Sequence, residues 1–354
     1  MLTRTTSSPK LATVIDLSLL KSIDITLDRY INLFVDLAPS LIGLERLFAR
    51  VSPLRLHNFS SVKFPTDCQE AITAVLAVKP LKYLCLRGLR ETTNLHRILA
   101  HHGPTLHGLS LEPYERDHHT GPENGCYRYP KWATTDIALL AETCPNIVEL
   151  RIQIRRTEGN AQECELYRAL GRMLPKLRTL ILDLHFDPRE EGPDAETMRK
   201  MRPVQFEDEE VEEIIVDAPL FRTTLINAAT DETLALGIWN LISRSQSSRF
   251  LQNLRIAPFG LEMYSIDECY YLIFLARSFL VSRSSKRDEN PSVNEMGKMG
   301  WTVWQEENYG PVEDCELPQG ADEVVALLWP ALVGRDSWET GWASFPLEDG
   351  VIVN

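Results

Sequence analysis

Residues 147–154, IVELRIQI, carry the pattern that decides the fold. After Ile147, the aliphatic residues Leu150, Ile152 and Ile154 alternate with polar ones. Such period-2 alternation is typical of a short strand with one buried face. The same pattern begins again at Leu20, Leu81, Leu106, Leu177 and Leu251. A further copy lies near Leu41, Leu44 and Leu47, where two frames three residues apart fit equally well.

A segment with helical periodicity precedes the repeated strands, and a proline follows it. The helical sets are Ile31, Phe34 and Val35; Ile72, Val75 and Leu76; Leu95, Ile98 and Leu99; Ile137, Leu140 and Ala141; and Leu166, Ala169, Leu170 and Met173. The prolines are Pro39, Pro80, Pro104, Pro145 and Pro175. Because proline cannot continue a helix, the chain is expected to turn at each of them.

The repeated order of helix, proline and strand predicts an α/β fold of the leucine-rich-repeat type. We expect an irregular solenoid with a curved parallel sheet on the concave side and helices on the convex side. The alternative is a conventional α/β sheet with helices on both faces, whose strands are usually continuous apolar runs. Here the residues between the leucines are polar, which favours a sheet with one open face.

The repeats are interrupted, and the pattern changes near residue 260. We predict a solenoid over residues 11–260, with inserts near 113–132 and 187–213; the second insert has eleven acidic and four basic residues. Between the inserts and the last repeat we expect a strand over 223–227 and a helix with Leu234, Ile238 and Leu241. Residues 261–354 are expected to form a buried helix over 266–281, a polar linker over 282–298 and a capping tail with five of the seven tryptophans.

Composition excludes several classes of protein. The chain of 354 residues is 44% hydrophobic and 25% charged, as in an average soluble protein. A net charge of −13 is against a general nucleic-acid binder, and no apolar run is long enough to span a bilayer. Seven dispersed cysteines without a CxxC motif indicate reduced thiols, and therefore the cytoplasm or nucleus.

Two short stretches resemble a known family. Residues 143–152, TCPNIVELRI, are similar to the CPxLxxLxL core of F-box-type leucine-rich-repeat proteins. Residues 174–180 and 80–84, and the tail segments 328–330 and 342–347, resemble fungal F-box-like proteins. The resemblance implies recognition of a protein target, as in substrate adaptors of ubiquitin ligases. Because the first strand is predicted to begin near Leu20, we expect no counterpart of the segment by which that family joins a ligase, as in a shortened relative or a protein that never joined one.

No catalytic motif was found, so we expect a protein that is not an enzyme and has no cofactor or metal. The best metal-like pattern is Asp183-x-His185-x-Asp187, but same-face residues on a strand stand almost 7 Å apart, too far for one ion. His118, His119 and Cys126 lack an obvious fourth zinc ligand. His101, His102 and His107 lie around a helix end and are expected to cap it.

The polar positions between the leucines predict the binding surface. Alignment on the second leucine places Arg87, Glu112, Gln153 and Asp183 in one row, and Cys85, Ser110, Arg151, Ile181 and Arg255 in the next. A third row holds Tyr114, Arg155 and His185. Row neighbours about 4.8 Å apart can partly satisfy one another's charges. The candidate contact residues are Tyr83, Arg87, Glu112, Arg151, Gln153, Arg155, Asp183 and His185.

Mixed polar rows of this kind suit a protein surface. We therefore expect a monomeric, non-enzymatic scaffold that recognises a protein target, with no nucleic-acid or membrane partner. Two alternatives remain: a small-molecule receptor with a pocket between Arg151 and Arg155, and a metal-dependent enzyme that uses Asp183 and His185.

Overall fold

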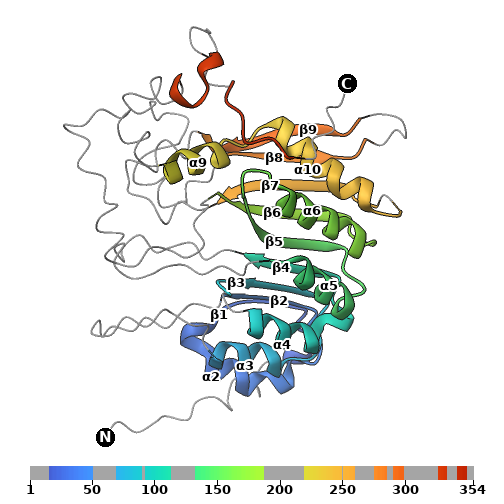
Figure 1. Ribbon diagram of the computed structural model, residues 1–354. Coiled ribbons are helices and arrows are strands. Elements are labelled where there is room, and N and C mark those ends of the chain that lie inside the picture. The colour runs from blue at the N-terminus through green and yellow to red at the C-terminus, as the bar shows by residue number, and fades with distance from the viewer. Residues whose placement is uncertain are drawn as a thin grey trace, which may run out of the picture. The chain divides into compact units, whose positions relative to one another are not determined.

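A computed structural model describes residues 16–50, 69–89, 92–112, 132–186, 219–248, 250–259, 275–284, 290–298, 326–332 and 341–348. The expected α/β class is confirmed: the chain forms a nine-stranded, mostly parallel sheet whose strand order follows the sequence (Figure 1). The described residues divide into two compact units, one ending at Gln153 and the other beginning at Ile154. We call them unit 1 and unit 2.

Unit 1 contains the first four repeats and the start of the fifth strand. Its strands are β1 (Ser22–Thr26), β2 (Arg46–Arg50), β3 (Tyr83–Arg87), β4 (Gly108–Glu112) and the first part of β5 (Glu149–Arg155). Its helices are α2 (Leu27–Leu37), α3 (Gln69–Ala77), α4 (Thr92–His102) and α5 (Thr134–Thr143), with short 3-10 turns at Leu17–Leu19, Ala38–Ser40 and Gly103–Thr105. The last two turns contain Pro39 and Pro104, so the chain turns there as predicted.

The strands of unit 1 pair in parallel and in one register. Leu47 on β2 is paired with Ile23 on β1 and with Leu84 on β3, and the same row continues to Leu109 and Leu150. This register decides between the two frames that fit near Leu41: the repeat begins at Leu44, and Leu47 and Ala49 are its strand residues. All members of the row except Ile23 are at most 2% exposed.

One face of this sheet is buried and the other is open. On β2 the buried positions Leu47 and Ala49 alternate with the exposed positions Arg46, Phe48 and Arg50. The buried face packs under the helices, which contact one another in chain order from α2 to α5 (Figure 1). The polar residues between the leucines therefore lie on the face that the described helices do not cover. We call it the open face.

Unit 2 begins with the same alternation and ends differently. Its helices are α6 (Ala161–Met173), α9 (Pro219–Ala228) and α10 (Glu232–Ser245), and its strands are β6 (Thr179–His185), β7 (Asn253–Phe259), β8 (Arg277–Ser282) and β9 (Ser292–Lys298). β6 and β7 are parallel, whereas β7, β8 and β9 form antiparallel pairs. Among the described residues, no helix combines the length and apolarity needed to cross a membrane.

Three predictions for unit 2 are wrong, and the helix expected around Leu234 and Ile238 is confirmed as α10. Residues 223–227 belong to helix α9 rather than to a strand, since Thr224 to Thr230 are all buried and show no one-sided period. The predicted helix over 266–281 ends in strand β8, and the predicted linker over 282–298 contains strand β9. The inserts at 113–131 and 187–213 lie outside the described residues, as does the rest of that helix up to residue 274.

Part of the tryptophan-rich tail packs into the core of unit 2. Trp342, Leu328 and Leu332 join a buried cluster with Phe186, which follows β6, and with Leu225 of α9. Trp301, Trp304 and Trp338 lie outside the described residues. The tail segment that is described therefore contributes apolar side chains to the same core as the last parallel strands.

The side chain of His102 forms hydrogen bonds with the backbone of the preceding repeat of unit 1. Its ring is fully buried, its Nε2 lies 3.1 Å from the carbonyl oxygen of Val75, and its Nδ1 accepts from the amide of Leu81 at 3.3 Å. Burial, together with the nearby ring of His101, lowers the pKa of His102 to about 4. The expectation of a charged cap at the end of its own helix is therefore wrong: a neutral His102 binds the backbone of the preceding repeat.

We predict that His102 makes the protein less stable in mild acid. Because the folded-state pKa lies below the unfolded value, the unfolded chain binds more protons between about pH 6.5 and 4, and stability falls as pH falls through that range. The contribution lost between pH 7 and 5 is up to about 2 kcal/mol. Denaturant unfolding at both pH values should show a smaller pH dependence in His102→Gln than in the wild type. His107→Gln, at an exposed position, is the control, and an unchanged pH dependence in His102→Gln would refute the assignment.

Candidate functional site

A shared carboxylate organises the open face of unit 1. Glu112, at the end of β4, accepts hydrogen bonds from Arg87 at 2.6 and 3.0 Å, and its other oxygen lies 2.8 Å from Nη1 of Arg151. Arg87 and Glu112 are register partners, as the predicted row requires. Register also confirms the rows Cys85–Ser110–Arg151 within unit 1 and Ile181–Arg255 within unit 2.

The charges of this cluster influence the protonation of Glu112 and Cys85. Burial alone would raise the pKa of Glu112, but the hydrogen bond from Arg87 and the charge of Arg151 outweigh it and hold that pKa below its usual range. The neighbouring Cys85 responds in the opposite direction: burial and the charge of Glu112 raise its thiol pKa to about 11. Cys85 is therefore a thiol at neutral pH, which is a poor state for a nucleophile.

An aromatic stack continues the open face toward the start of the strands. The guanidinium of Arg46 lies 4.7 Å from the ring centroid of Tyr83, within cation–π range. The same ring fills the space beside Gly108, where a Cβ atom would lie 2.5 Å from Cδ1 of Tyr83. Because Gly108 has no side chain, the ring of Tyr83 can occupy the space beside β4. Arg46 of β2 stacks on that ring.

Sequence reasoning missed Arg46, Phe48 and Arg50, which are all exposed on the open face. Phe48 is 44% exposed and stands between the two arginines on the same face of β2. It is paired with Asp24 on β1 and Cys85 on β3. The sequence contains the repeat pattern that places these residues on the strand, but two frames fit near Leu41 and the choice between them was open. Beginning the repeat at Leu44 gives these three residues directly.

Two of the predicted contact residues are buried, which corrects the expectation that their positions are wet. Gln153 is 5% exposed and Asp183 is 2% exposed, although both occupy open-face positions of their strands. Strand parity predicts the direction in which a side chain points, but it does not predict how deeply the side chain is covered. Neither residue is accessible to a partner in this arrangement.

The other predicted residues are partly exposed. Tyr83, Arg87, Glu112 and Arg151 lie together on unit 1. In unit 2, Arg155 and His185 are half-buried, and the ring of His185 lies 5.6 Å from that of Phe259. Tyr114, which was placed in the same row, lies outside the described residues. The candidate site of unit 1 therefore consists of the Glu112 cluster, the Arg46–Tyr83 stack and the exposed Phe48.

Two observations on the described residues bear on metal and small-molecule binding. No group of three His, Cys, Asp or Glu side chains among them is arranged to hold a metal ion, and Asp187, His118, His119 and Cys126 lie outside those residues. A hollow on the helix side of unit 1, lined by Leu95, His96, Leu99, Trp132 and Asp136, has about 10 Å³ of space. That volume is about enough for one water molecule and too small for a metabolite.

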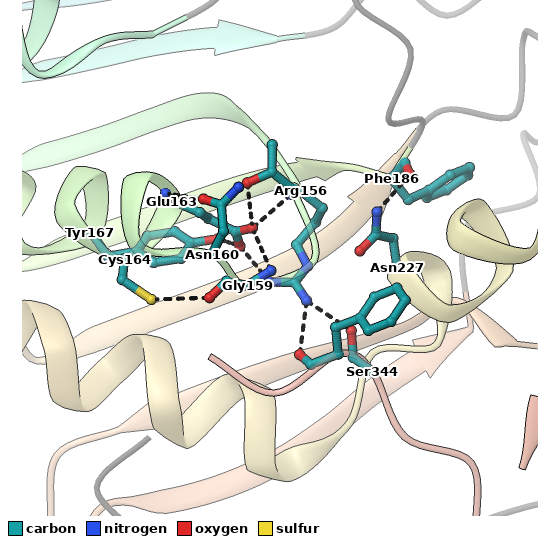
Figure 2. Close-up of polar contacts among 11 residues, drawn as sticks. Arg156, Gly159, Asn160, Glu163, Cys164, Tyr167, Phe186, Asn227 and Ser344 are labelled. Atoms are coloured by element: carbon teal, nitrogen blue, oxygen red, sulfur yellow. Dashed lines mark hydrogen bonds and ion pairs between the residues drawn. The ribbon is translucent and has the colours of Figure 1, made fainter. Parts of the chain in front are cut away.

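A second polar cluster is buried in unit 2 around Arg156 (Figure 2). The carboxylate of Glu163 forms an ion pair with Arg156 and accepts from the hydroxyl of Tyr167 at 2.8 Å. Its other oxygen accepts from the amides of Thr157 at 2.7 Å and Gly159 at 3.1 Å. Neither Arg156 nor Glu163 has any exposed side-chain surface. The buried charge of each is therefore compensated by the opposite charge of the other.

The Arg156 cluster fastens the described end of the tail. Arg156 donates to the hydroxyl of Ser344 at 3.0 Å and to the carbonyl of Phe345 at 3.1 Å (Figure 2). Gly159 has a φ of +75°, and a Cβ atom there would lie 2.2 Å from the carbonyl oxygen of Pro346. Burial raises the pKa of Tyr167 far above its ordinary value, and the charge of Glu163 adds to that effect. Tyr167 remains a neutral donor, which indicates a structural clasp rather than a catalytic group.

We predict that this clasp is essential for the stability of unit 2. Glu163→Gln removes the charge that compensates the buried Arg156, which typically costs about 3–5 kcal/mol. Glu165→Gln, two residues along the same helix, breaks only solvent-accessible ion pairs with Arg168 and Arg172 and should cost less than about 1 kcal/mol. Denaturant unfolding of the two variants is the measurement. Equal losses of stability in both would contradict a clasp at Arg156.

The comparisons with known proteins identify no relative. A scan against models of protein families finds no match to the chain, and a search of curated proteins finds no significantly similar sequence. The resemblance to F-box-type leucine-rich-repeat proteins therefore stays a prediction.

Proposed function

We propose that the protein is a non-enzymatic scaffold that binds a protein target on the open face of its sheet. The observation that carries this proposal is the one-sided burial of the strands. Leucines fill the face under the helices, while arginine, glutamate and aromatic side chains share the other face. Mixed charges around exposed aromatic groups are typical of surfaces that recognise proteins.

The finer features of the fold form part of the same proposal. We infer that the repeated units are leucine-rich-repeat modules stacked as a solenoid, with the tail as a terminal cap. In-register parallel pairing from β1 through β4 and from β6 to β7 supports this inference. Residues 143–152 are similar to F-box-type repeats. On that similarity we propose that the specific role is that of a substrate adaptor of a ubiquitin ligase.

A small-molecule receptor or an enzyme has less support. The raised thiol pKa of Cys85 is against covalent chemistry by the cysteine nearest the cluster. The hollow in unit 1 lies on the helix side and not at the Arg87–Glu112–Arg151 cluster. Recognition of a macromolecule over a broad surface fits these observations better than the binding of a compact ligand.

We predict that removing positive charge from the open face strongly lowers partner recovery without unfolding the chain. The test is quantitative affinity purification from native cells with mass spectrometry, comparing wild type with Arg151→Gln combined with Arg255→Glu. Arg151 is partly exposed and Arg255 is exposed on β7, so recovery of specific partners should fall at least tenfold. The midpoint of thermal unfolding should move by only a few degrees.

The matched control lies away from the sheet. Lys79→Glu changes an exposed residue between α3 and β3 and should leave recovery unchanged. Loss of the same partners in Lys79→Glu, or full recovery in the open-face variant, would refute the proposal. A ubiquitin-ligase subunit among the recovered proteins is expected if the adaptor role holds.

A further inference from the structure

The β2 strand presents three side chains in a line. Arg46, Phe48 and Arg50 are exposed on the open face, and Leu47 and Ala49 between them are buried. Since same-face residues on a strand stand almost 7 Å apart, the two guanidinium groups are attached to Cα atoms about 13 Å apart, with the phenyl ring midway. This order of cation, aromatic ring and cation is fixed by the backbone of β2.

The two arginines of β2 differ from the other arginines of this face. Arg87 and Arg151 both interact with Glu112. Within the described ranges, by contrast, no carboxylate forms an ion pair with Arg46 or Arg50. Arg46 is held by the ring of Tyr83, which positions its guanidinium without neutralising it. The positive charge at β2 is therefore available to a partner.

The carboxylates of the open face are placed unevenly. Glu112 and Glu149 lie on β4 and β5, two or more strands away from β2. Asp24 on β1 is the register partner of Phe48, but it forms no ion pair with either arginine among the residues described. Glu45, which precedes Arg46, is paired with Lys21 and Lys82, so Asp24 is the carboxylate that would compete with one from a partner.

An extended peptide matches this line of side chains. Its own residues at positions i−2, i and i+2 also stand almost 7 Å apart on one side. Carboxylates at i−2 and i+2 would reach Arg46 and Arg50, while an apolar side chain at i would cover Phe48. Arginine favours such pairs because its planar guanidinium binds carboxylates through two parallel hydrogen bonds.

We propose that β2 is the docking strand for an acidic linear segment of a partner protein, with the pattern acidic-x-apolar-x-acidic. The inference rests on the proposed recognition function and deepens it by naming the partner chemistry. The chain as a whole carries a charge of −13, so long-range attraction does not bring such a segment in. Selection occurs at short range, where the spacing of Arg46, Phe48 and Arg50 applies.

The test is a peptide-display selection against the full chain at low salt, followed by fluorescence polarisation with the enriched peptide. Enriched sequences are expected to carry acidic residues two positions on either side of an apolar one. Arg46→Glu and Arg50→Glu should each weaken binding at least tenfold, and Phe48→Ala several-fold. Asp24→Asn removes the competing carboxylate and should tighten binding, whereas Lys79→Glu should change nothing.

Each other outcome overturns the inference. Enriched peptides without flanking acids, or peptides that bind Arg46→Glu and Arg50→Glu as well as wild type, would place recognition elsewhere and leave the proposed function standing. Failure of the selection to enrich any peptide would remove β2 as a peptide site, while the affinity purification tests the wider function separately. A single-stranded oligonucleotide that binds through the same arginines, in place of peptides, would show a nucleic-acid site instead.

Variants at exposed positions should fold normally, and thermal unfolding verifies this. Arg46→Gln and Arg50→Gln remove each charge without reversing it. If a glutamate variant unfolds, these neutral variants provide the measurement, with an expected loss of several-fold in affinity.

Discussion

The structure depends on the burial of one aliphatic column by strands that pair in parallel and in register. In unit 1 the column passes through Leu47, Leu84, Leu109 and Leu150, which are between 0 and 2% exposed. A single repeat has too little apolar surface to bury its own leucines, so each depends on its neighbours. The same constraint orients every other strand residue toward the opposite face.

That orientation decides which side chains lie on the open face. Because Leu47 and Ala49 on β2 are buried beside Leu84 and Leu86 on β3, the remaining positions bring Arg46, Phe48 and Arg50 beside Tyr83, Cys85 and Arg87. Glu112 then neutralises part of the charge and fixes Arg87 and Arg151. The result is a face with an ion-paired polar cluster and, two strands away from Glu112, a strand whose two arginines form no ion pair with any described carboxylate.

Much of the fold could be predicted because alternation and helical periodicity coincide in each repeat. The strands from β1 to β7 and the helices α2 to α6 and α10 follow from apolar spacing and from prolines such as Pro39 and Pro104. The errors occur where one-sided burial is lost. In helix α9 the residues from Thr224 to Ala228 are all buried, and the apolar run that enters β8 cannot be distinguished from a helix by periodicity.

The candidate site was predicted less completely. Arg87, Glu112 and Arg151 were placed together because row neighbours follow directly from the repeat frame. Phe48 and its flanking arginines were missed because Ala49 takes the place of a leucine in that repeat, which left the frame ambiguous. Gln153 and Asp183 show a different limit: alternation gives the face of a residue, whereas its depth depends on what covers the strand.

A cross-link across β2 and β3 tests the register most directly. Phe48 and Cys85 are register partners, and strand spacing places their Cα atoms within the range that a disulfide spans. Because the pKa of the Cys85 thiol is raised to about 11, a catalysed oxidation is needed. Peptide mapping of Phe48→Cys after oxidation should show a 48–85 disulfide, and the same treatment of Glu45→Cys should show no 45–85 bond. A 45–85 bond without a 48–85 bond would mean that the repeat is shifted by three residues, and the account of the open face would be wrong.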